Sequence, residues 1–161
     1  VSSDTEQHMA AGVLEGYLTA RHIHTTYLNA LAYTFHGSVS EAAVAFLEEQ
    51  MAWAHAQAQA HPDDNFWQLT DAILAQFDGL VLGYGLAVEG GLAPPLPASA
   101  FLILNSVGDL FQIIPAVDLP RRPDLAGMSA AQLRQYVKRR GMCSGLIKVP
   151  GDFSDLFMAH S

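Results

Sequence analysis

Apolar side chains recur at helical spacing through most of residues 1–140. The spacing predicts a first helix whose buried face carries Met9, Val13, Leu14, Tyr17 and Leu18. The same criterion predicts further helices over residues 19–35, 38–61 and 130–140, and a long helix that begins near Phe66 and continues past Val81. A mostly apolar stretch at residues 98–114 is interrupted by Asn105, Ser106 and Asp109, and a proline-containing loop is expected over residues 115–127. We therefore expect residues 1–140 to form a mainly helical layer.

Capping residues mark where several of these helices begin. Ser38 and Glu41 have the spacing of a capping box, and Ser129 and Gln132 repeat that spacing before the last helix. A turn and cap at residues 62–65 separates the two longest helices. These signals place the helix starts more firmly than the apolar spacing alone.

Three glycines fall in the later half of the helix that begins near Phe66. Gly79, Gly83 and Gly85 each cost roughly 1 kcal/mol of helix stability relative to alanine. Alternatively, they allow another element to pack closely against this helix. Residues 90–97 are rich in glycine and proline, so we expect them to break the helix and cross the surface.

The pattern changes near the C-terminus. Residues 144–149 and 156–160 have strand composition and are separated by a turn at residues 150–152, which predicts a β-hairpin. A two-stranded hairpin is not stable alone, so further strands are expected to join it. We therefore predict an α+β fold in which residues 1–161 are a single segment of one larger domain. Residues 141–161 would start its core sheet.

Composition narrows the range of partners. Half of the residues are hydrophobic and 15% are charged, as is typical of a globular segment. The net charge of −8 argues against a nucleic-acid partner. No uninterrupted apolar run reaches about 18 residues, so no transmembrane segment is predicted. The first four residues lack the features of a signal peptide, although a processed chain would have lost one.

Cys143 is the only cysteine, and it is the first candidate for chemistry. It follows the basic run at residues 138–140, and neighbouring cations favour the thiolate, which is the nucleophilic form. The alternative is a small, buried, apolar residue without chemistry.

His160 is the second candidate. It lies 17 residues after Cys143, at the end of the returning strand of the predicted hairpin. The two ends of a hairpin are close in space, so the imidazole could face Cys143 and move a proton or donate a hydrogen bond. The alternative is a surface histidine at the end of a strand.

Other polar residues carry weaker signals. His22 and His24 point about 200° apart on a helix, so they cannot chelate one ion from one face, and we expect neither a metal nor a cofactor. Asn105 and Asp109 are expected either as buried, hydrogen-bonded groups or as a helix cap. Asp78, within an apolar helix, is interpreted in the same way.

Six stretches together resemble the phospholipase B-like family of N-terminal nucleophile hydrolases. They occur in the order of the family and are AGVLEGYLTA (residues 11–20), NFW (65–67), AQFDGL (75–80), LNSVGDL (104–110), CSGLIKV (143–149) and LFMAHS (156–161). The resemblance implies an αββα sandwich.

The resemblance also implies a mechanism. Family members are cut autocatalytically just before a cysteine, which becomes the N-terminal nucleophile and uses its own α-amino group as the base; Cys143 matches that cysteine. His160 matches a histidine that lines the active site. A cut after Ser161 is the alternative, and it would make Cys143 a bystander. The implied substrate is a phospholipid, from which fatty acyl chains are removed, or a related acyl amide.

The resemblance suggests a companion chain from the same precursor, which would complete the fold, and a lysosomal or secreted location. A bacterial relative would be extracytoplasmic. Two other interpretations remain open. One is a catalytically inactive lipid-binding or scaffold protein on the same fold. The other is a helical accessory fragment that needs its partner chain.

Overall fold

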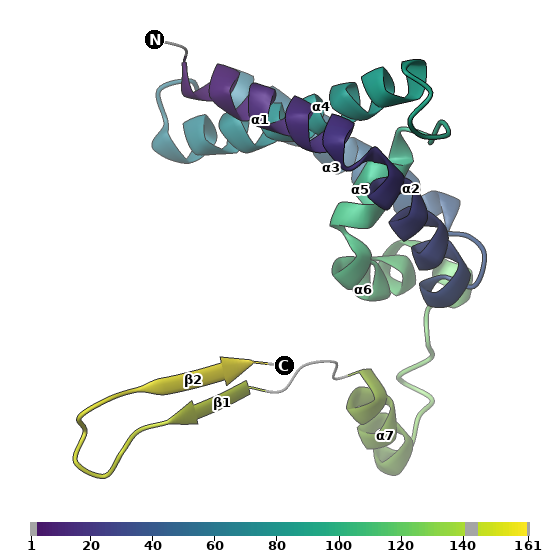
Figure 1. The fold of residues 1–161 in the computed structure, drawn as a ribbon. Coiled ribbons are helices and arrows are strands. Elements are labelled where there is room, and N and C mark those ends of the chain that lie inside the picture. The colour runs from purple at the N-terminus through teal and green to yellow at the C-terminus, as the bar shows by residue number, and fades with distance from the viewer. Residues whose placement is uncertain (1–2, 141–144, 161) are drawn as a thin grey trace. The chain divides into compact units, whose positions relative to one another are not determined.

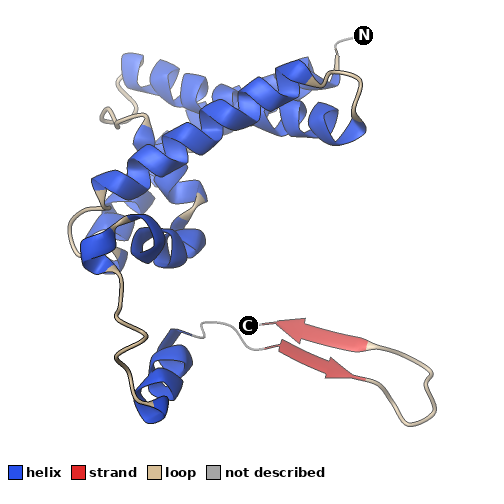
Figure 2. Cartoon of the chain, turned by 180° about the vertical axis from the view of Figure 1, so that it is seen from behind, coloured by secondary structure: helices blue, strands red, loops and turns tan. Residues whose placement is uncertain are grey.

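The structure is a computed structural model that describes residues 3–140 and 145–160. The elements are α1 (Asp4–Leu18), α2 (Ala20–Asn29), the π-helical η1 (Ala30–Thr34), α3 (Glu41–Ala60), α4 (Asn65–Glu89), α5 (Ser99–Asn105), α6 (Val107–Val117), the 3₁₀-helical η2 (Leu119–Arg121), α7 (Ala130–Arg140), β1 (Gly145–Lys148) and β2 (Phe157–His160) (Figures 1 and 2). The chain divides into a helical unit, residues 1–122, and a C-terminal unit, residues 123–161. Helices and an antiparallel hairpin confirm the α+β class.

Glycines hold α1 and α4 side by side (Figure 1). A Cβ atom at Gly12 of α1 would overlap the main-chain carbonyl of Gln76, and one at Gly83 of α4 would overlap that of Val13. Gly16 and Gly79 are enclosed in the same way, by the main chain of the opposite helix. Gly79 and Gly83 therefore serve close packing, which was one of the two sequence interpretations, whereas a Cβ atom at Gly85 would meet nothing within 4 Å.

This glycine contact changes which face of α1 is buried. Gly12 and Gly16 are its buried residues, whereas Leu14 and Leu18 are 61% and 74% exposed. The prediction that Leu14 and Leu18 lie on a buried face is therefore wrong. Two helices approach most closely where side chains are absent, so the small residues face α4 and the leucines turn away.

The core of the helical unit lies where α3, α4, α5 and α6 meet. Ala43, Ala87 and Leu110 are 0% exposed, and Phe101 is 2% exposed. The rings of Tyr84 and Phe101 meet edge to face, with centroids 5.2 Å apart. The Tyr84 hydroxyl donates a hydrogen bond to the Pro94 carbonyl oxygen at 2.6 Å, which ties the proline-rich crossing to α4.

Two predicted helix starts are confirmed. The Asp64 carboxylate accepts from the Phe66 amide at 2.8 Å and so caps α4. At α7, the Ser129 amide donates to the Gln132 side-chain oxygen at 2.8 Å, and the Gln132 amide donates back to the Ser129 hydroxyl at 3.4 Å.

Two other predictions at helix ends are wrong. Ser38 and Glu41 form no capping box, because α3 begins at Glu41 and Ser40 precedes it. Helix α6 continues through Pro115 to Val117, where a loop was expected from Pro115 onward. The Arg122 side chain donates to the carbonyl oxygens of Pro115 and Ala116, which satisfies acceptors at this helix end.

Helix α4 is long and apolar enough to cross a membrane, and 39% of an apolar 18-residue stretch within it is buried inside the structure. Helices α5 and α6 would qualify as a pair but are bent by 105°. A core helix of a water-soluble protein has the same length and composition, so no membrane-spanning role follows.

Candidate functional site

The hairpin of the C-terminal unit positions His160. Strands β1 and β2 pair antiparallel, with Gly145 opposite His160 and Lys148 opposite Phe157. The connecting loop spans residues 149–156, which is longer than the predicted turn. The hairpin itself is confirmed, and it places His160 across from a residue two positions after Cys143 in the sequence.

Cys143 lies outside the residues that the structure describes. The imidazole of His160 is exposed, as is every residue of both strands. The pairing partner of His160 is thus known, and the proximity of its side chain to Cys143 stays a prediction.

The polar residues between α5 and α6 form a helix break. The Asn105 side-chain amide donates to the Phe101 carbonyl oxygen at 2.9 Å, one turn back in α5. Asp109 lies in the first turn of α6, where a carboxylate interacts favourably with the positive end of the helix dipole. Both side chains are exposed, so the interpretation of these two residues as buried groups is wrong, and a structural role at the helix ends fits them.

A histidine–aspartate pair joins α3 to α4. His55 Nε2 lies 3.6 Å from Asp78 Oδ1, and both side chains are partly exposed. The sequence placed Asp78 in an apolar helix but did not predict this partner, because the two residues are far apart along the chain. Within the described residues, no group of three or more His, Cys, Asp or Glu side chains could hold a metal ion.

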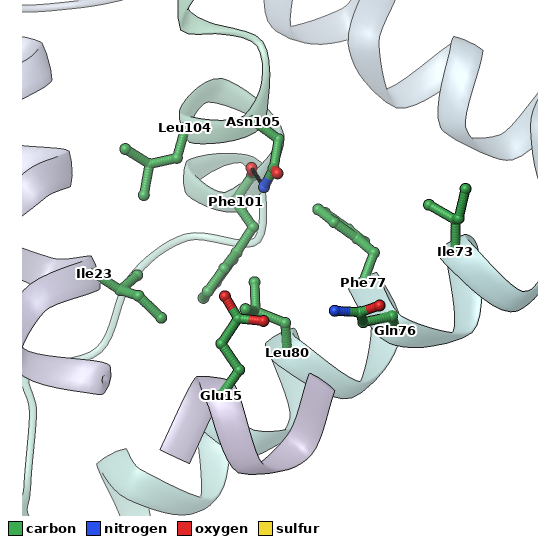
Figure 3. A pocket seen from close by; sticks show the side chains of 9 residues that line it. All are labelled: Glu15, Ile23, Ile73, Gln76, Phe77, Leu80, Phe101, Leu104 and Asn105. Atoms are coloured by element: carbon green, nitrogen blue, oxygen red, sulfur yellow. Dashed lines mark hydrogen bonds between the residues drawn. The ribbon is translucent and has the colours of Figure 1, made fainter. Parts of the chain in front are cut away.

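A pocket of about 430 Å³ opens between four helices of the helical unit (Figure 3). It is lined by Glu15 of α1, Ile23 of α2, Ile73, Gln76, Phe77 and Leu80 of α4, and Phe101, Leu104 and Asn105 of α5. The volume is within the range of ordinary ligand pockets, roughly 300–1,000 Å³. The sequence did not reveal this pocket, since its walls come from segments that share no motif.

Comparison with known proteins places the chain in a family. The family model for phospholipase B matches residues 1–161, which is the whole chain. The chain belongs to the phospholipase B family. The resemblance seen in the six sequence stretches is thereby confirmed.

Several individual relatives agree with this assignment. The chain is 34% identical over 154 residues to phospholipase B from Crotalus adamanteus, with 94% of this chain and 28% of the relative covered. It is 33% identical over 154 residues to phospholipase B-like 1 from Homo sapiens, with 94% and 26% covered. The chain therefore spans about a quarter of the length of the curated relatives that it matches.

Proposed function

We propose that this protein is a hydrolase of the phospholipase B type, which releases fatty acyl chains from phospholipids or related acyl amides through Cys143. Support comes from the family match over the whole chain and from relatives that are named phospholipase B. The observation that carries the residue assignment is the hairpin register, which pairs His160 with Gly145, two positions from the cysteine.

The proposed reaction has two steps. The Cys143 sulfur attacks the acyl carbonyl carbon and forms a thioester, while the alcohol or amine leaves with a proton. Water then attacks the thioester, which releases the fatty acid and returns the proton to sulfur. Hydrolysis of the peptide bond before Cys143 would free its α-amino group to act as the base. His160 would donate a hydrogen bond to the reacting groups.

The proposed setting of this site is an αββα sandwich, completed by a companion chain from the same precursor. Ile147 and Met158 are a directly opposed pair in the hairpin, and they are 68% and 71% exposed. Burial of such exposed apolar residues under another layer would stabilise the fold, and helices and a second sheet would supply that layer in a sandwich. A lysosomal or secreted location, or an extracytoplasmic one in a bacterium, is part of this proposal.

The cleavage can be tested on the purified protein. Intact-mass analysis and N-terminal sequencing should find a fragment that begins Cys143-Ser144. Such a fragment carries an amine and a thiol on the same residue, so it should condense with 2-cyanobenzothiazole, which an internal cysteine does not do. Since Cys143 is the only cysteine of this chain, labelling of the fragment reports on that residue alone.

The catalytic roles need matched substitutions. Cys143→Ala should abolish both the cut and the release of fatty acid, and His160→Gln should lower the release at least about 100-fold, as expected for a lost acid–base group. His61→Gln, an exposed histidine of the helical unit, should change neither. An uncut protein whose hydrolysis survives Cys143→Ala would reject the cysteine mechanism. An uncut protein that binds lipid without hydrolysing it would favour the scaffold alternative.

A further inference from the structure

The pocket between α1, α2, α4 and α5 combines an apolar lining with one acidic group. Six of its lining residues are apolar, namely Ile23, Ile73, Phe77, Leu80, Phe101 and Leu104. Figure 3 shows the Glu15 side chain pointing from α1 toward this apolar surface. Such a surface suits a hydrocarbon chain, since burial of apolar area drives its binding.

Three polar side chains line the pocket, and among them only Glu15 carries a formal charge. Glu15 offers its carboxylate. The Asn105 amide donates one of its two hydrogens to the Phe101 carbonyl oxygen, and its side-chain oxygen remains an acceptor. The Gln76 side-chain oxygen lies 3.2 Å from His8 Nδ1, which leaves the amide nitrogen of Gln76 as a donor at the pocket. The negative charge of Glu15 therefore favours a head group that is positively charged and donates hydrogen bonds.

Basic groups of the helical unit are bound elsewhere. This unit has three Lys or Arg against thirteen Asp or Glu, a net charge of −10. Arg21 donates to the Leu92 carbonyl oxygen at 3.0 Å, Arg121 pairs with Asp118 at 3.3 Å, and Arg122 donates to the end of α6. Among the described residues that line the pocket, none is a lysine or an arginine.

We propose that this pocket binds a single-chain amphiphile with a cationic amine head, the chain lying on the apolar lining and the ammonium beside Glu15. The ammonium donates to the Glu15 carboxylate and meets an opposite charge there. A fatty acid carboxylate or a lipid phosphate would instead meet Glu15 as a like charge, and the described lining residues include no lysine or arginine to neutralise it. The inference uses residues of the helical unit alone, so it goes beyond the proposed function and does not depend on Cys143.

Calorimetric titration of the full 161-residue chain tests the proposal. The probes are dodecylamine and dodecanoate at pH 7, each below the concentration at which it forms micelles. They share one chain length and carry opposite charges at this pH. Dodecylamine should bind about tenfold tighter than dodecanoate, or more, as one close charge interaction near a protein surface permits.

Three variants separate Glu15 from general effects. Glu15→Gln should bring the two affinities to within about threefold, because it removes the charge and keeps the shape. Glu49→Gln, on an exposed position of α3 outside the lining, makes the same charge change and should keep the preference. Ile73→Gln, at a lining residue that is 65% exposed, should weaken both probes and leave their ratio unchanged.

The outcomes distinguish a binding site at Glu15 from general attraction of the amine to the negatively charged helical unit. The proposal is supported if only Glu15→Gln removes the preference for the amine. It is overturned if dodecanoate binds as tightly as dodecylamine to the unsubstituted chain, or if Glu15→Gln leaves the ratio unchanged. It is also overturned if Glu49→Gln lowers the ratio as much as Glu15→Gln does. Circular dichroism of each variant is measured before titration. If Glu15→Gln has lost helical signal, Glu15→Asp replaces it and should keep the preference for dodecylamine.

Discussion

The helical unit and the C-terminal unit differ in how far they bury apolar side chains. In the helical unit, Leu110 is fully buried and Ile103 is 3% exposed. In the hairpin of the C-terminal unit, Ile147, Phe153 and Met158 are 68%, 84% and 71% exposed. Similar side chains thus contribute burial energy in one unit and little in the other. We infer that the folding free energy of this chain resides mainly in residues 1–122.

The two units also differ in charge. The helical unit has a net charge of −10, whereas the C-terminal unit carries five Lys or Arg against three Asp or Glu, a net charge of +2. The overall charge of −8 conceals this difference. Four of the five basic residues fall between positions 134 and 140, just before Cys143. A net charge for the whole chain is therefore a poor guide to the environment of either candidate site.

The largest expected effect compares one apolar truncation in each unit. Leu110→Ala should lower the free energy of unfolding by about 2–5 kcal/mol, because it leaves a cavity in the core. Ile147→Ala should change it by less than about 0.5 kcal/mol, since that side chain is mostly exposed. Urea unfolding followed by tryptophan fluorescence measures both, and both tryptophans, Trp53 and Trp67, lie in the helical unit. Equal losses of unfolding free energy in the two variants would mean that the hairpin contributes to the stability of the helical core.

A smaller effect tests how the helical unit achieves its burial. Gly83→Ala places a methyl group against the main chain of α1 and should cost about 1–3 kcal/mol. Gly85→Ala is the matched control on the same helix, because a Cβ atom there meets nothing within 4 Å. That control should gain roughly 0.5–1 kcal/mol from helix propensity. The urea midpoints of the two variants should shift in opposite directions from that of the unsubstituted chain. Shifts in the same direction would contradict the close packing of α1 on α4.

These glycines illustrate what the sequence could predict about the fold. Apolar spacing and capping residues located the helices well, as Ser129 with Gln132 and the start of α4 show. They failed for the buried face of α1, because periodicity assumes that large apolar residues face inward. Gly12 and Gly16 face inward instead, and only the position of α4 explains why.

The candidate sites show a similar division. The hairpin and the position of His160 at its end followed from strand composition and a turn signal, which are local. The pocket around Glu15 did not, because it gathers residues from four helices whose packing no local pattern encodes. The His55–Asp78 pair was missed for the same reason.

The smallest effect concerns Tyr84, where the proline-rich crossing meets α4. Tyr84→Phe removes the hydrogen bond to the Pro94 carbonyl oxygen and should cost about 0.5–1.5 kcal/mol at pH 7. Burial raises the pKa of the Tyr84 phenol above its ordinary value, so the folded state favours the neutral form. The stability that comes from keeping this phenol neutral is fully present below the pKa of tyrosine in the unfolded chain, about 10. It is lost as the pH rises through the higher pKa of Tyr84 in the folded chain.

The stability gap between the unsubstituted chain and the Tyr84→Phe variant should therefore be constant up to about pH 9 and narrow above about pH 10. Urea unfolding at a series of pH values measures this gap, and the comparison cancels the titration of the other tyrosines and of the lysines. Since phenylalanine cannot ionise, only the unsubstituted chain carries the cost of a buried phenolate. A gap that stays constant to pH 11 would mean that water reaches this hydroxyl, and that the core of the helical unit is more open at the crossing than its 3% exposure at Tyr84 indicates.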